Sequence, residues 1–288
     1  MKEFKAIEVP YKIILSSDKT NKIYPLIRDD NNGYIKIYNP SPLHGRSFVV
    51  DKNEETGRYI ISKGNGLAYS GHTFFSTSHL RGDLRGALLE TDAIRDFNVG
   101  TEIQSYGIKT NQFEYVLELL DDIVFEADMD KKTNLALLQY SVESPYRICD
   151  YPFMPKSTLL KELEKWDMLD YNRLGKRYLI AADVIMRNIR IMREHGAMHN
   201  AMHTQNITWA LELLDFESGR TNTFPYSNPE YESFVLELRE AECAQAYEVI
   251  NYISWCTGEK VDYSEIDKVF ENNGFSLNKR NAYLKISH

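Results

Sequence analysis

The sequence has few cysteines, no excess of basic residues and no long apolar run. Its three cysteines, Cys149, Cys243 and Cys256, are widely spaced and form no Cys-x-x-Cys pair. This spacing argues against both a disulfide framework and a cysteine-based zinc site. No stretch approaches the roughly 18 apolar residues of a transmembrane helix, and the N-terminus lacks the apolar core of a signal peptide. We therefore expect a cytoplasmic chain with no membrane partner.

Charge of one sign is also limited. The chain carries 34 lysines and arginines against 42 aspartates and glutamates, which gives a formal charge of −8. Binding to a nucleic-acid backbone without sequence preference needs a basic surface, so nucleic acid is not an expected partner. The length of 288 residues lies where one hydrophobic core usually divides into two.

The first half of the chain has the pattern of strands and turns. Short runs rich in β-branched and aromatic residues are typical of strands, and the turn-prone segment 29–33 separates the first two of them. One helix is expected at Leu84–Phe97, where apolar residues recur at helical spacing. The predicted extended segments are Tyr11–Leu15, Tyr34–Tyr38, Arg58–Ser62, Glu102–Gly107 and Leu135–Val142.

The second half has helical periodicity. Ser157 is a candidate N-cap for a first helix, and Tyr178–Arg193 and Tyr231–Cys256 show apolar residues at helical spacing. Strands followed by helices predict an α+β chain with two unequal parts. We expect a β-rich N-terminal lobe at residues 1–143, with one key helix, and a mostly helical C-terminal lobe at residues 144–288.

A lysine and a glutamate form the first candidate constellation. In protein kinases a strand lysine contacts the nucleotide phosphates, and a glutamate on a helix fixes that lysine. Lys63 directly follows the apolar run Tyr59–Ile61, and Glu90 lies in the expected helix. Two ordinary surface charges are the alternative, because a lysine at the end of a strand is common.

Asn206 and Asp215 form the second constellation. They are nine positions apart and flank the apolar stretch Ile207–Leu214. Mg²⁺ prefers hard oxygen ligands, which one amide and one carboxylate supply when they sit on opposite arms of a short strand pair or loop. An aspartate that caps a turn is the alternative.

Three histidines at four-residue spacing offer a rival metal site. On an uninterrupted helix, His195, His199 and His203 would share a face and could bind zinc or iron. Gly196 and Asn200 weaken this reading, because both are poor helix formers. A metalloprotein built on this histidine ladder stays a hypothesis for the chain, ranked third after the two given below.

Several local patterns, taken in order, resemble the selenoprotein O family. The segment that begins at Lys63 looks like its lysine–glycine–x–glycine segment, and the segment that ends at Glu90 is similar to its helix bearing the glutamate partner of that lysine. The resemblance covers roughly residues 55 to 217 in patches. The matching segments are Lys63–Ser70, Leu84–Glu90, Phe97–Thr101, Ser144–Arg147 and Ala197–Ile207, together with the interval from Asn206 to Asp215.

The resemblance implies a two-lobed, protein-kinase-like fold and an enzyme that uses ATP with Mg²⁺ or Mn²⁺ to transfer AMP to protein hydroxyls. It implies ATP contacts at Lys63, Gly64, Gly66 and Arg147, a lysine-orienting role for Glu90, and metal ligation by Asn206 and Asp215. The chain is shorter than usual members of the family and lacks their long C-terminal region.

Gln205 is the most consequential departure from the family. It stands where the family has the aspartate proposed as general base, and an amide cannot accept a proton at neutral pH. His203 or His199 could replace that base, since imidazole titrates in the right range. We therefore expect a transferase that moves AMP or a phosphoryl group onto a hydroxyl of a protein, peptide or small molecule. The alternative is a catalytically silent pseudokinase that binds nucleotide or a partner.

Overall fold

The computed structural model describes residues 1–18, 22–66, 86–120, 134–170, 172–226 and 228–275. The chain divides into two compact units. Unit one comprises Met1–Phe97 and Asn111–Tyr146, and unit two comprises Asn98–Thr110 and Arg147–His288. The chain passes from one unit to the other after Phe97, Thr110 and Tyr146, and the last of these positions lies three residues after the expected boundary at 143/144. Nothing in the sequence order indicates that Asn98–Thr110 belongs to unit two.

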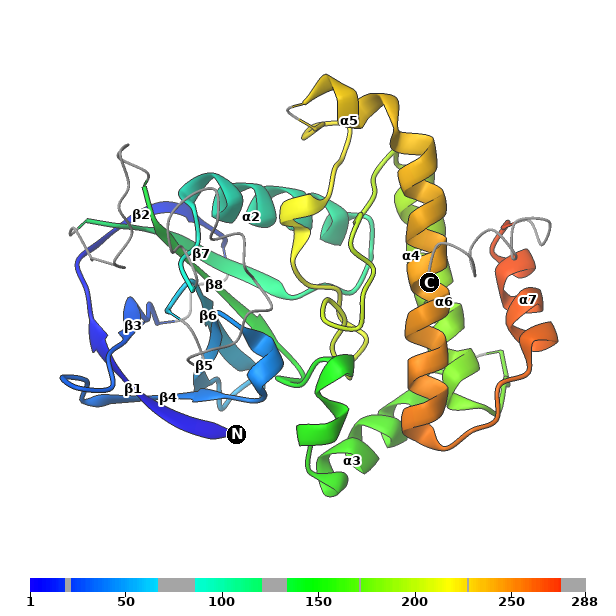
Figure 1. Cartoon of the computed structure of the whole chain (residues 1–288), viewed down its shortest axis with the longest axis horizontal. Coiled ribbons are helices and arrows are strands. Elements are labelled where there is room, and N and C mark those ends of the chain that lie inside the picture. The colour runs from blue at the N-terminus through cyan, green and yellow to red at the C-terminus, as the bar shows by residue number, and fades with distance from the viewer. Residues whose placement is uncertain (19–21, 67–85, 121–133, 171, 227, 276–288) are drawn as a thin grey trace. The chain divides into compact units, whose positions relative to one another are not determined.

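Unit one contains an eight-stranded sheet whose neighbouring strands all pair antiparallel. The strand order is β2-β7-β8-β6-β5-β4-β1-β3, and Figure 1 labels each strand. A short 3₁₀ helix, η1 (Pro42–His44), precedes β5. The strands are β1 (Lys2–Glu8), β2 (Tyr11–Ser16), β3 (Leu26–Arg28), β4 (Ile35–Asn39), β5 (Ser47–Lys52), β6 (Tyr59–Lys63), β7 (Gln112–Leu119) and β8 (Ala136–Val142).

Alternation of side chains determines which face of each outer strand is buried. Phe4 and Ala6 of β1 point to the same face and pack with Leu26, Ile37 and Phe48 from neighbouring strands. The central strand β8 is buried at every position. Both faces of this strand are therefore shielded from water, although it carries the polar residues Gln139 and Ser141. The extended segment expected at Leu135–Val142 is present from Ala136 onward. The other expected strands at Tyr11, Tyr34 and Arg58 are present within a residue or two as β2, β4 and β6.

Helix α2 (Glu90–Ser105) begins and ends later than the sequence predicted. Leu88 accepts a backbone hydrogen bond from the N–H of Ala136, and Leu89 forms a bridge with Leu135. These pairings hold the chain extended up to Glu90. Leu88 and Leu89 are therefore not helical, contrary to the prediction of a helix at Leu84–Phe97, and Leu84 itself lies outside the described residues. The predicted extended segment Glu102–Gly107 is wrong as well, because its first four residues are helical.

Unit two is helical. Helices α4 and α6 pack against each other along their length (Figure 1), and α4 also contacts α3 and α7. The indole of Trp166 stacks on that of Trp209 with centroids 5.4 Å apart and donates to the Trp209 carbonyl at 2.8 Å. The helices are η3 (Ile148–Phe153), α3 (Lys156–Asp167), α4 (Arg177–Glu194), η4 (Phe216–Ser218), α5 (Pro229–Ser233), α6 (Val235–Thr257) and α7 (Tyr263–Asn272).

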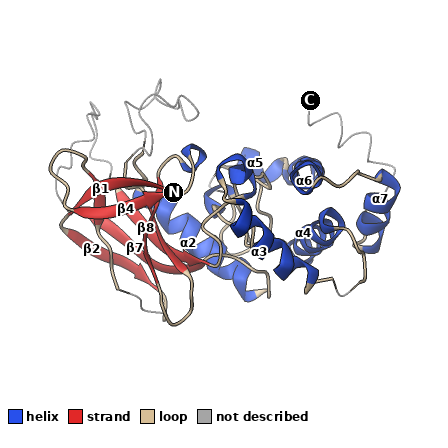
Figure 2. Cartoon of the chain, turned by 90° about the horizontal axis from the view of Figure 1, so that it is seen from below, coloured by secondary structure: helices blue, strands red, loops and turns tan. Residues whose placement is uncertain are grey.

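The chain is thus a mixed α/β protein, with an antiparallel sheet in unit one and helices in unit two (Figure 2). All three cysteines are buried and free. Across the described ranges, no helix combines the length and apolar character needed to cross a bilayer.

Candidate functional site

A buried ion pair is the most unusual feature of unit one. Lys63 ends β6, and its Nζ lies 2.9 Å from Oδ2 of Asp96 on α2. The two side chains are only 4% and 2% exposed. Because removing two charges from water costs several kcal/mol each, a buried pair seldom adds stability over an apolar pair of similar volume. Its presence is therefore a candidate mark of function.

Glu90 is not the partner of Lys63. It is the first residue of α2, and its carboxylate accepts a hydrogen bond from Nδ2 of Asn134 at 2.8 Å. Six helical residues correspond to about 240° of rotation, so Glu90 and Asp96 leave α2 on different faces. Asp96 shares the buried face with Ala93 and Phe97. The expected Lys63–Glu90 pair is therefore replaced by Lys63–Asp96.

Gly64 and Gly66 have a conformational role in this structure. Their φ angles are +101° and +106°, in the region that favours glycine. A Cβ on Gly64 would lie 2.7 Å from the carbonyl oxygen of Ala136. Both backbone N–H groups already donate, Gly64 to Arg46 at 2.8 Å and Gly66 to Gly86 at 3.0 Å. The phosphate contact predicted for these two residues stays a prediction, and it cannot use amides engaged in this way.

In unit two, Asn206 and Asp215 flank a small hairpin. Ile207 and Leu213 form an antiparallel bridge, and the N–H of Leu214 donates to the carbonyl of Asn206 at 2.9 Å. Pairing of these arms brings the backbone of Asn206 next to that of Leu214, one residue before Asp215. The expected strand-pair geometry is therefore present, and both residues lie in unit two.

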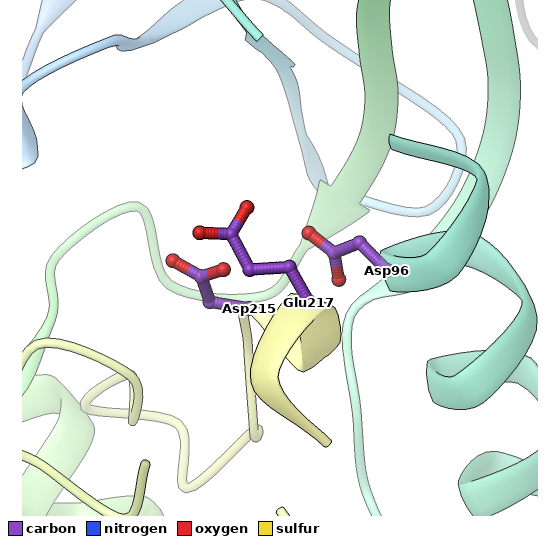
Figure 3. A group of neighbouring side chains, drawn as sticks. All are labelled: Asp96, Asp215 and Glu217. Carbon is purple, nitrogen blue, oxygen red and sulfur yellow. The ribbon is translucent and has the colours of Figure 1, made fainter. Parts of the chain in front are cut away.

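Asp215 has a second carboxylate beside it. Carboxylate oxygens of Asp215 and Glu217 lie within 4.8 Å of each other at the start of η4, whereas Asp96 projects from α2 (Figure 3). Asp215 has a left-handed backbone with φ +66°, which is uncommon outside glycine, asparagine and aspartate. Two carboxylates and the nearby Asn206 are hard oxygen donors of the type that Mg²⁺ or Mn²⁺ prefers. The donor set fits the predicted divalent ion.

The side chain of Arg147 binds the backbone of Gln205, the residue before Asn206. Arg147 is 7% exposed, and its Nη1 donates to the carbonyl of Gln205 at 2.9 Å. Arg147 also forms an antiparallel bridge with Thr208, within the hairpin. The structure thus uses Arg147 to fix the backbone just before Asn206. The phosphate contact implied for Arg147 by resemblance stays a prediction.

The three histidines do not form a ladder on one helix. Helix α4 ends at Glu194, His195 is its C-cap, and Gly196 takes a φ of +71°. His199 is fully buried, whereas His195 and His203 are exposed. In the part of the chain that the structure describes, the groups with metal-binding geometry include no histidine. The histidine-ladder metal site is therefore wrong, because the helix it requires ends before the second histidine.

The ring of His199 instead connects two segments of the chain, through Leu214 and Ala201. Its Nε2 lies 2.8 Å from the carbonyl oxygen of Leu214, and its Nδ1 accepts from the N–H of Ala201 at 3.2 Å. This pattern requires the neutral tautomer with hydrogen on Nε2. Burial lowers the pKa of His199 to about 4, outweighing the opposite effects of the Leu214 carbonyl and the Asp215 charge. His199 therefore has a structural role, and His203 is the exposed imidazole still predicted as a base.

Acid should destabilise the protein through His199. Above pH 6.5 the residue is neutral in both states, so its full contribution is present. Between about pH 6.5 and 4 the unfolded chain takes up a proton that the folded chain resists, and the free energy of unfolding falls by up to about 3 kcal/mol. Urea unfolding of wild type and His199→Gln at pH 7 and pH 4.5 checks this. The variant should show a smaller acid loss, and His203→Gln should match wild type. Equal losses in all three would contradict the assignment.

Helix α6 holds the same loop from the other side. Oε1 of Glu242 accepts the N–H groups of His199 and Asn200 at 2.8 and 3.1 Å, and Gln245 accepts that of Met202 at 2.8 Å. Burial raises the pKa of Glu242, partly offset by these donors and by nearby arginines. The loop that leads to Asn206 is therefore anchored through its backbone by two side chains of α6.

Sequence reasoning missed Asp96 and Glu217. The signal for Asp96 was its position three residues after Ala93, on the apolar face of the helix, where an aspartate needs a partner. Glu217 follows Asp215 by two residues, a spacing that predicts nothing until the chain turns into η4.

Comparison with known proteins adds little evidence on the family or the activity of this chain. No family model matches the chain, and no curated protein matches it. One solved structure with similarity is described as WaaP in complex with acyl carrier protein, at 12% sequence identity and a TM-score of 0.36. The alignment covers 88% of this chain and 90% of that chain. At these values the similarity assigns neither a fold family nor an activity, and the resemblance to selenoprotein O stays a prediction.

Proposed function

We propose that this chain is a nucleotide-dependent transferase of protein-kinase-like fold that moves a phosphoryl group or AMP from Mg-ATP to a hydroxyl. The observation that carries the proposal is the Lys63–Asp96 pair, a buried ammonium held by a carboxylate from a helix. Kinase-like enzymes use such a lysine on the nucleotide phosphates. Asp96 takes the orienting role that the resemblance implies for Glu90.

The metal-binding role falls to unit two. Asp215 and Glu217, with the amide oxygen of Asn206, would hold the divalent ion, which neutralises charge on the phosphates. Catalysis would then rest mainly on positioning and electrostatic stabilisation, so Gln205 in place of an aspartate need not abolish turnover.

The two transfers differ in the bond that breaks. In phosphoryl transfer, the acceptor oxygen bonds to the γ-phosphorus while the bond to the β–γ bridging oxygen breaks, and ADP leaves. In AMP transfer, the acceptor oxygen bonds to the α-phosphorus, and pyrophosphate leaves. In both, the hydroxyl proton passes to a base, for which His203 is the candidate, or to solvent.

A nucleotide-binding protein without turnover is the second candidate. Gln205 favours it, because an amide side chain cannot serve as a base and its backbone carbonyl is engaged by Arg147. The acidic pair at Asp215 and Glu217 does not separate the two candidates, since either of them would bind Mg-ATP.

Labelled ATP distinguishes these candidates. Purified protein is first heated with and without Mg-ATP, and both candidates require a higher melting temperature with Mg-ATP. Incubation with α- or γ-labelled ATP and a mixture of protein and small-molecule hydroxyl acceptors follows. Transfer of γ-label with ADP release indicates phosphoryl transfer, and α-label with pyrophosphate indicates AMP transfer. A melting shift with no transfer supports the binding protein. No melting shift would contradict nucleotide binding altogether.

A further inference from the structure

Three arginines of unit two converge near the C-terminal end of α4. Arg193 lies in the last turn of α4, Arg239 lies on α6, and Arg220 follows η4. Nη2 of Arg193 donates to the backbone carbonyl of Arg239. Nη1 of Arg220 donates to the carbonyl of Gly196, two residues beyond the end of α4, at 3.0 Å. Three separate segments thus each place an arginine side chain or its backbone near this end of the helix.

These guanidinium groups are incompletely satisfied. The Nε atoms of Arg193, Arg220 and Arg239 are all buried, and none makes a hydrogen bond. Nε of Arg220 lies 3.1 Å from a carboxylate oxygen of Glu232, so the two form an ion pair whose N–H is poorly aligned. Arg239 differs from the other two arginines, because no described residue forms a hydrogen bond or an ion pair with its guanidinium group. A half-buried cation in this state is costly unless something pairs with it.

Like charges add to this cost. Burial, followed by the charges of Arg193 and Arg220, lowers the pKa of Arg239, and Glu242 acts in the opposite direction. Glu242 is a weak counter-charge, because burial raises its own pKa and its Oε1 is already bound to backbone N–H groups. With Glu232 engaged by Arg220, the cluster of described side chains carries more positive than negative charge.

We propose that Arg193, Arg220 and Arg239 form a binding site for a dianionic phosphate group, either inorganic phosphate or a phosphate monoester. Guanidinium groups donate two parallel hydrogen bonds to phosphate oxygens, and the charge-assisted bonds are about twice as strong as neutral ones. A bridging water could accept the N–H of Arg239, but it would not offset repulsion among three cations. A phosphate group would both accept this N–H and offset the repulsion, because it carries negative charge.

Phosphate at this site would steady the segment that carries the metal ligands. Arg220 comes three residues after Glu217 and five after Asp215. A phosphate bridging Arg220 to Arg193 and Arg239 would tie that segment to α4 and α6. The site shares no residue with the Lys63–Asp96 pair or with the carboxylates of η4, so the proposal stands independently of the proposed transferase.

Titration with phosphate tests the site. Wild type, Arg239→Gln and Arg190→Gln are melted in chloride and in inorganic phosphate at equal ionic strength, and phosphate binding is measured by calorimetry. Arg190 is the matched control, since it is 44% exposed on the same α4 and pairs with Glu194. We expect phosphate to raise the melting temperature of wild type and Arg190→Gln by several degrees. Arg239→Gln should bind phosphate at least about tenfold more weakly.

Two further arms identify the source and location of the anion. Tighter binding of phosphoserine or phosphotyrosine than of inorganic phosphate would point to a modified side chain, whereas equal or weaker binding would point to the free ion. The double variant Lys63→Met/Asp96→Ala, which lacks the buried ion pair of unit one, should keep the phosphate response. Equal responses in phosphate and chloride for wild type would overturn the proposal. So would a response that Arg239→Gln retains or that the double variant loses.

Discussion

The Asp96→Asn variant should lose about 3–5 kcal/mol of folding free energy, because it removes the carboxylate that faces the buried ammonium of Lys63. An amide can accept one hydrogen bond from the ammonium but supplies no charge to balance it. The same variant should lose the stabilisation that Mg-ATP gives to wild type, since Lys63 would no longer be held in place. Urea unfolding with and without Mg-ATP measures both effects.

Glu90→Gln is the matched comparison for this variant. Glu90 lies on the same helix and contacts Asn134 at the surface, so its replacement should cost less than about 1 kcal/mol. A large loss in Glu90→Gln with a small one in Asp96→Asn would restore the pairing that the sequence suggested. If Asp96→Asn fails to fold, Lys63→Met/Asp96→Ala should recover most of the stability, because it removes both charges, yet show no Mg-ATP response.

Asp215→Asn should weaken the Mg²⁺-dependent part of nucleotide binding and turnover by about 100-fold or more, because metal stabilisation of phosphate charge is worth several kcal/mol. Asparagine is the appropriate replacement. It tolerates the left-handed backbone of Asp215 as aspartate does, so the hairpin should survive, whereas alanine at φ +66° would add strain. Titration of Mg²⁺ against the ATP-induced melting shift and against transfer measures the effect.

The control for Asp215→Asn is the same substitution at an aspartate away from the loop. Asp167 of α3 is 53% exposed and pairs with Arg177, so Asp167→Asn should leave the Mg²⁺ dependence unchanged. Glu217→Gln should weaken the Mg²⁺ response less than Asp215→Asn if it is an auxiliary ligand. An unaltered Mg²⁺ titration in Asp215→Asn would remove the metal assignment, whatever the behaviour of unit one.

The local pattern of the sequence predicted part of the secondary structure, because periodicity reports which face of an element is buried, but it missed β1, β3, β5, β7 and α7. Runs of β-branched and aromatic residues predicted β2, β4, β6 and β8, and helical spacing predicted α4 and most of α6. Local spacing also predicted the hairpin arms that end in Asn206 and Asp215, since the residues between them are apolar and close in sequence. The interpretation of the histidines failed for a local reason, the glycine that follows the end of α4.

The sequence alone determined that Lys63 would end a strand and that Asn206 and Asp215 would flank an apolar turn. Only the tertiary structure decided which carboxylate meets the lysine, because pairing of Leu88 with Ala136 delays the start of α2 and turns Asp96 inward instead of Glu90. The arginine cluster was equally beyond the sequence, since its members are 19 to 46 positions apart and meet only when α4, α6 and the segment after η4 pack. Contacts between residues far apart in the chain depend on how elements pack, and periodicity carries no information about that.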